Sequence, residues 1–113
     1  MSVIAITGTG SLFGQAIIKS IKSSSFKNST LIGMDYFENT VGSNWVDKNF
    51  VLPDLLDIAI TQSIWLKSVQ SIINDNHVEI LFVGVDFELP LFSKYKNQIE
   101  RLTSCKVIVS DER

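Results

Sequence analysis

The chain has 113 residues, of which 45% are hydrophobic and 19% charged, so we expect one folded domain with a single core, spanning residues 1–113. Its formal net charge is −2 and its Lys and Arg residues are scattered, which leaves no basic face for nucleic acid. The single cysteine, Cys105, excludes an internal disulfide; its place before an apolar run indicates a packed thiol and favours the cytoplasm. Neither a secretory leader nor a membrane-spanning run is recognisable, so no membrane partner is expected.

The first part of the chain is its most informative stretch. Residues 3–7 are an apolar, β-branched run that leads into a glycine-rich turn and then into a segment with helical apolar spacing. A strand, a tight turn and a helix in this order present backbone N–H groups to an anion. We therefore expect the turn to bind an anionic substrate group through Gly8, Thr9, Gly10 and Ser11. The alternative is that the glycines only permit a tight turn.

The spacing within this turn departs from the dinucleotide fingerprint G-x-G-x-x-G. Phe13 stands where the third glycine belongs, and Gly14 comes one position later. The serine of the turn offers a test of ligand contact, because Ser11→Ala removes only a hydroxyl. We expect that substitution to lower ligand affinity and to leave stability almost unchanged.

The remaining elements alternate along the chain. Strands are predicted at residues 31–35, 49–52, 78–85 and 106–109, with 78–85 as the central strand because its apolar run is almost unbroken. Helices are predicted near residues 62–76, capped by Thr61 or Ser63, and near 91–102. The order β-α-β-β-α-β-α-β predicts an α/β fold, a doubly wound, Rossmann-like parallel sheet of about five strands with helices on both faces.

Acidic residues follow two of the predicted strands. Asp35 comes about 20 residues after Gly14, the offset at which a dinucleotide-binding fold places the acid that holds a ribose hydroxyl. The alternative is an acid that hydrogen-bonds the next loop. Glu88 is predicted to bind a substrate amine or ribose, and Asp86 is a second candidate for substrate binding at the same edge, although an extended backbone would point the two side chains in opposite directions. The alternative for both acids is helix capping.

Other catalytic arrangements find little support. His77 is the single histidine, it follows the helix predicted at 62–76, and no Cys-x-x-Cys motif is present, so we expect a surface turn rather than a metal site. The motif G-x-S-x-G is absent, which disfavours a serine hydrolase. No catalytic residue is predicted within the chain.

Five segments in order carry a resemblance to a known family. They are residues 6–17 (ITGTGSLFGQAI), 33–35 (GMD), 47–53 (DKNFVLP), 85–89 (VDFEL) and 106–110 (KVIVS). With these segments the chain resembles the N-terminal pre-ATP-grasp domain of ATP-grasp ligases, particularly proteins similar to the large chain of carbamoyl phosphate synthase.

The resemblance implies a division of labour. A downstream ATP-grasp domain would bind ATP and Mg²⁺ and activate a carboxylate as an acyl phosphate that an amine attacks. The present chain would contribute to binding the small-molecule carboxylate or amine, would hold neither ATP nor Mg²⁺ by itself, and would be inactive alone.

Two other interpretations stay open. The glycine turn together with Asp35 is compatible with an NAD(P)-binding Rossmann domain of an oxidoreductase or epimerase. A non-catalytic interaction module is the third interpretation, for which a homodimer is the partner to test.

Overall fold

Five parallel strands form one sheet in this computed structural model, which describes residues 2–25, 27–37, 39–53, 62–85 and 88–109. The strands lie in the order β3-β2-β1-β4-β5. Their bounds are β1 Val3–Thr7, β2 Thr30–Asp35, β3 Lys48–Val51, β4 Ile80–Phe82 and β5 Lys106–Ile108. The predicted α/β, Rossmann-like fold with a parallel sheet is confirmed.

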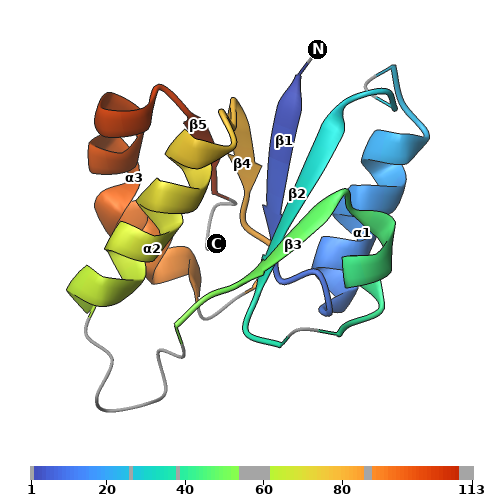
Figure 1. Ribbon diagram of the computed structural model, residues 1–113, viewed down its shortest axis with the longest axis horizontal. Helices are drawn as coiled ribbons and strands as arrows, with labels where there is room; N and C mark the ends of the chain where they lie inside the picture. Colours follow the sequence, from blue (N-terminus) through green and yellow to red (C-terminus); the bar gives the residue numbers. More distant parts are fainter. Residues whose placement is uncertain (1, 26, 38, 54–61, 86–87, 110–113) are drawn as a thin grey trace.

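Helices cover both faces of the sheet, as a doubly wound fold requires. Helix α1 (Leu12–Lys22) lies on one face, and α2 (Gln62–Asp75) and α3 (Leu89–Thr103) lie together on the other (Figure 1). A 3-10 turn, η1 (Gly42–Trp45), packs beside α1. The larger core cluster lies under α2 and α3, with Trp65 against Phe92 and both fully buried, and the smaller one lies under α1.

The central strand is β1, not the predicted strand at residues 78–85. Only Ile80–Phe82 pair in the ladder, and β4 lies between β1 and the edge strand β5. Val78 and Val83 are 3% exposed and extend the apolar run on either side of β4. The prediction was wrong because apolar character reports burial, and these two side chains are buried by packing outside the strand.

One of the two alternatives predicted for the cap of α2 is wrong. Ser63 is the second residue of α2 rather than its cap, and the other predicted cap, Thr61, lies outside the described residues.

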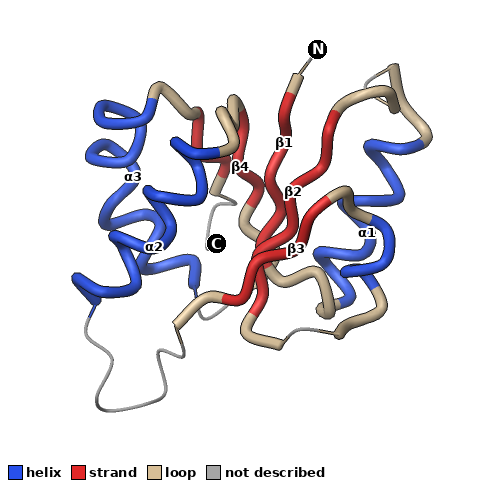
Figure 2. Tube along the Cα trace, viewed as in Figure 1, coloured by secondary structure: helices blue, strands red, loops and turns tan. Residues whose placement is uncertain are grey.

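The carboxyl ends of the strands gather at one edge, the lower edge of the sheet in Figure 2, where the loops after β1, β2 and β4 meet. That edge positions the candidate site.

Two leucines test the core. Leu81 in β4 is 0% exposed, whereas Leu102 in α3 is 58% exposed. We expect Leu81→Ala to lower the free energy of unfolding by about 2–5 kcal/mol, because it leaves a cavity. Leu102→Ala, the matched control, is expected to change it by no more than about 0.5 kcal/mol. Urea denaturation measures both, and equal losses would contradict the core assignment.

Candidate functional site

The glycine turn begins at Gly8, directly after β1. Gly8 has φ +67°, and a Cβ there would lie 2.0 Å from Val85 Cγ2. Its N–H donates to the Met34 carbonyl oxygen at 2.7 Å. Gly14, inside α1, is equally constrained, because a Cβ on it would lie 2.1 Å from the carbonyl oxygen of Gly8. The close approach of helix to strand therefore requires these glycines whether or not a ligand binds.

The hydroxyl of Ser11 serves the protein itself. Its oxygen accepts the N–H of Gly14 at 2.9 Å, which makes Ser11 the N-cap of α1. The hydroxyl lies 2.8 Å from the Gly8 carbonyl oxygen and 2.7 Å from that of Gly84, and donates toward both. The N–H of Gly84 in turn donates to Thr7 Oγ1 at 2.9 Å. Side chains thus join β1 and β4 beyond the last paired residues of their ladder.

The carboxylate of Asp35 lies at the glycine turn, where the sequence predicts an external anion. Its Oδ2 accepts the N–H of Gly10 at 2.8 Å and lies 3.3 Å from Thr9 Oγ1, while Oδ1 accepts the N–H of Tyr36 at 2.6 Å. Asp35 is 6% exposed. Of the two interpretations of this acid, the structure favours the one in which it hydrogen-bonds the neighbouring loops.

The segment after Asp35 packs over the same turn. The hydroxyls of Thr40 and Thr9 lie 3.0 Å apart, and a Cβ on Gly10 would lie 2.9 Å from the Cβ of Thr40. A Cβ on Gly42 would lie 2.0 Å from the Thr9 carbonyl oxygen. Thr9 is consequently 0% exposed. The structure brings the predicted residues of the turn together, and they bind one another. These residues are Gly8, Thr9, Gly10, Ser11 and Asp35.

Glu88 belongs to a second cluster, on the other face of the sheet. Its Oε2 accepts the Tyr36 hydroxyl at 2.5 Å, and the Tyr36 oxygen accepts the indole N–H of Trp65 at 3.0 Å. Glu88 is 0% exposed, and its Oε1 has no hydrogen-bond partner among the described residues. Successive strand side chains alternate, so Asp35 and Tyr36 point to opposite faces and the single predicted site becomes two clusters.

The structure tests the capping interpretation of Glu88. Glu88 is the N-cap residue of α3, yet its side chain makes no capping hydrogen bond, so the capping interpretation was wrong for this residue. Asp86 lies outside the described residues. Tyr36 and Trp65 were not predicted as site residues, and the one signal for them in the sequence was the position of Tyr36 beside Asp35 at the end of a predicted strand.

The surroundings of Glu88 change its protonation. Burial raises the pKa of its carboxyl from 4.5 to about 7, although the hydrogen bond from Tyr36 lowers it. Burial, followed by the nearby charge of Glu88, raises the pKa of the Tyr36 phenol well above its ordinary value. Near neutral pH the carboxyl therefore exists in both protonation states, while Tyr36 keeps its proton.

The other candidate groups lie apart from these clusters. His77 is exposed in the turn between α2 and β4. Cys105 is 1% exposed and burial raises its pKa to about 12, as expected for a packed thiol. Among the described residues, no group of three or more His, Cys, Asp or Glu side chains could hold a metal ion. None of the helices in the described ranges is long and apolar enough to cross a membrane.

Solved structures of NAD complexes share this fold. The WlbA (WbpB) dehydrogenase of Thermus thermophilus, in complex with NAD and alpha-ketoglutarate, superposes with a TM-score of 0.57 at 13% identity over 97% of this chain and 41% of the dehydrogenase. The dTDP-glucose 4,6-dehydratase of Bacillus anthracis, in complex with NAD, gives 0.51 at 14% identity over 85% and 35%. This likeness shows the fold alone. The chain spans less than half of either enzyme.

Sequence comparison adds no family assignment. No protein-family model and no curated protein matches the chain.

The contacts of Ser11 correct our expectation for Ser11→Ala. The substitution removes the α1 cap and a donor to the Gly84 carbonyl oxygen, so we expect the free energy of unfolding to fall by about 1–2 kcal/mol. Ser20→Ala, at an exposed position of the same helix, is the control and should stay within about 0.5 kcal/mol. Chemical denaturation of both variants is the measurement. An unchanged Ser11→Ala would show that the hydroxyl is dispensable for the turn.

The raised pKa of Glu88 predicts a pH dependence of stability. The folded carboxyl keeps its proton up to about pH 7, whereas the unfolded one loses it near 4.5, so folding takes up a proton between these values. Stability due to this group is complete below 4.5 and is lost as pH rises toward 7. At about 1.4 kcal/mol per pKa unit, the loss is on the order of 3 kcal/mol.

Glu88→Gln isolates this contribution, because it keeps the shape of the side chain without the titrating proton. We expect the difference in unfolding free energy between the two proteins to shift in favour of Glu88→Gln as pH rises through the interval. Urea titrations at several pH values measure it. Parallel pH curves for the two proteins would rule out Glu88 as the titrating group.

Proposed function

We propose that the chain is the N-terminal, substrate-side domain of an ATP-dependent carboxylate-amine ligase of the ATP-grasp type, similar to the large chain of carbamoyl phosphate synthase. In this role the chain is not catalytic by itself. The five ordered segments described above support the assignment, and so does the α/β fold on which they lie.

The observation that carries the proposal is the Asp35 carboxylate inside the glycine turn. A backbone N–H that already donates to a buried carboxylate at 2.8 Å is not available to a pyrophosphate, and a second anion at the same place would be repelled. The 6% exposure of Asp35 also leaves little of its surface for ribose hydroxyls. These contacts favour a protein that binds its nucleotide in another domain.

In such a ligase, ATP and Mg²⁺ bound by the downstream domain supply the acyl phosphate chemistry. The residues of the present chain shape the edge of the sheet beside which the small-molecule substrate is expected. The hydrogen bond between Tyr36 and Glu88 holds the end of β2 and the start of α3 together. Ser11 holds the start of α1 against the segment after β4.

An NAD(P)-binding domain of an oxidoreductase or epimerase is the second candidate. The solved structures favour it over the first, since those reported above are NAD complexes with the same fold. It requires the Thr40 segment to leave the glycine turn and Asp35 to release Gly10 before the cofactor binds.

Hydroxylamine trapping tests the ligase. With ATP, Mg²⁺, a panel of carboxylates and hydroxylamine, the product of the complete reading frame is expected to form ADP and a hydroxamate from at least one acid. The 113-residue chain alone should form neither. A reading frame without an ATP-grasp domain would contradict the proposal.

Titration of the folded chain with millimolar NADH tests the second candidate, the NAD(P)-binding domain. The first candidate predicts no saturable fluorescence change. Saturable binding that Gly10→Ala abolishes without unfolding the chain would establish the second candidate instead.

A further inference from the structure

A chain of hydrogen bonds at the carboxyl edge of the sheet ends on Glu88. The indole N–H of Trp65, in α2, donates to the Tyr36 oxygen, and the Tyr36 hydroxyl, directly after β2, donates to Glu88 Oε2. Glu88 itself lies directly before α3. The carboxyl group therefore joins the start of α3 to the end of β2 and to α2.

The carboxyl group of Glu88 lacks the partners that a buried charge requires. It is 0% exposed, and its Oε1 has no hydrogen-bond partner among the described residues. Asp35 provides the contrast within the same molecule, because both of its oxygens accept backbone N–H groups. A buried carboxylate is costly unless a cation or several donors compensate it, whereas the neutral carboxyl needs less compensation. The geometry at Glu88 therefore suits the protonated form.

The groups that face Glu88 from the surrounding elements do not supply this compensation. They are the Thr7 hydroxyl at the end of β1, the Tyr36 phenol and the Asp35 carboxylate at the end of β2, and, through Tyr36, the Trp65 indole of α2. Burial raises the pKa of Glu88, and the charge of Asp35, which has the same sign, raises it further. The first turn of α3 carries no acidic residue, and no described Lys, Arg or His acts on this pKa. Hydration is the remaining source of compensation for the charge.

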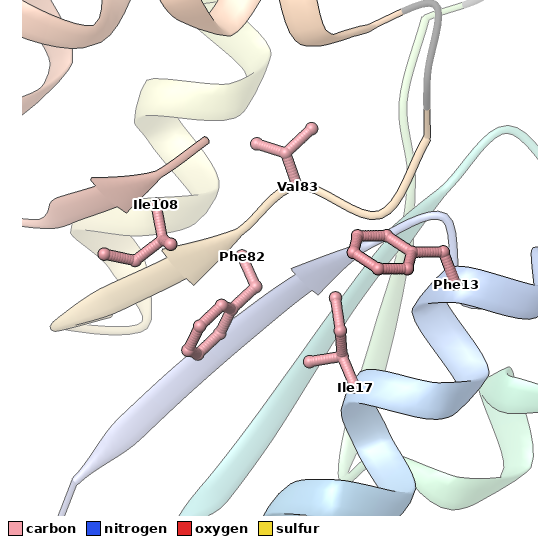
Figure 3. Close-up of a pocket in the computed structure, with 5 residues that line it drawn as sticks. All are labelled: Phe13, Ile17, Phe82, Val83 and Ile108. Carbon is pink, nitrogen blue, oxygen red and sulfur yellow. The ribbon is translucent and has the colours of Figure 1, made fainter. Parts of the chain in front are cut away.

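Water does not reach Glu88 through the apolar groove between α1 and the β4–β5 half of the sheet (Figure 3). All lining residues of that groove are apolar, and none of them belongs to the chain of hydrogen bonds that ends on Glu88. The lining residues are Phe13, Ile17, Phe82, Val83 and Ile108. Hydration of Glu88 therefore requires the start of α3 to move away from Tyr36.

The first turn of α3 is held weakly by its own residues. Glu88 makes no capping hydrogen bond with its side chain, and Pro90 has no N–H to donate. From Phe92 onward the helix is secured, because the Phe92 ring packs edge-on against Trp65 and is 0% exposed. A movement of residues 88–91 therefore leaves the buried part of α3 in place.

We propose that the Tyr36–Glu88 contact is a pH-sensitive switch. While Glu88 carries its proton, the start of α3 stays packed on the end of β2. Loss of that proton to solvent favours an open state, in which residues 88–91 leave Tyr36 and the carboxylate is hydrated. Since parallel α/β sheets bind their ligands at the carboxyl edge, the open state presents the Glu88 and Tyr36 side chains where a ligand is expected. The switch is independent of the ligase proposal.

The pKa of Glu88, raised by burial to about 7, places the switch near neutral pH. In the open state we expect the ordinary value of 4.5. The closed state is thus most stable below pH 4.5 and loses stability until about pH 7, because opening releases a proton in this interval. Between pH 4.5 and about pH 8 the opening constant should rise about 100-fold.

Amide hydrogen exchange in the 113-residue chain measures this constant. The reporter is the N–H of Phe92, whose partner in an α-helix is the carbonyl oxygen four residues earlier, that of Glu88. After correction for the intrinsic pH dependence of exchange, the constant at Phe92 should rise with pH and respond little to low urea, since local opening exposes little surface. The N–H of Ile6, in the central strand β1, is the control for global unfolding, and its opening constant should rise with urea.

Substitutions complete the test. Glu88→Gln should abolish the pH dependence at Phe92, whereas Glu100→Gln, farther along α3, should retain it. Tyr36→Phe removes the donor that lowers the pKa of Glu88, so the rise should continue to a higher pH, and this variant serves if Glu88→Gln does not fold. An opening constant at Phe92 that does not change with pH, or that rises with urea as steeply as that of Ile6, would overturn the proposal. So would an unchanged pH dependence in Glu88→Gln or Tyr36→Phe.

Discussion

The carboxylate of Asp35 accepts the N–H of Gly10 where the chain leaves β1 and enters α1. At this junction a parallel sheet concentrates unpaired backbone donors, which attract a negative charge. The chain supplies that charge from the end of β2, the strand next to β1. The same contact positions the segment around Thr40, which packs on the turn and buries Thr9. The Asp35 carboxylate thus orders three loops, and the first turn has a structural role.

The edge of the sheet is organised by the alternation of side chains at the end of β2. Asp35 faces the glycine turn, and Tyr36, one residue later, reaches Glu88 and Trp65 on the other face. The two clusters differ in physical character. Asp35 receives N–H donors on both oxygens, whereas Glu88 has one oxygen without a partner and a pKa of about 7. We therefore expect Glu88 to couple the stability of this edge to pH.

Among the described residues, the two faces of the sheet are unequally covered. Helices α2 and α3 seal one face completely at β4 and β5, while α1 leaves Phe82 and Ile108 beside an apolar groove on the other. The likeness to NAD complexes extends to the fold alone.

The alternation of apolar strands and helical patterns was sufficient to predict the α/β class, the parallel sheet and helices on both faces. The side-chain period of a strand and that of a helix are both local properties of the sequence. The packed state of Cys105 and the surface turn at His77 also followed from local sequence. The central position of β1 did not, since burial at Val78 and Val83 imitates a longer strand and pairing partners are not encoded locally. The sequence placed Asp35 and Glu88 at one edge, but only the tertiary structure decided what each binds. Their partners, Gly10 and Tyr36, lie 25 and 52 residues away along the chain, and the directions of these side chains follow from the packing of the whole sheet.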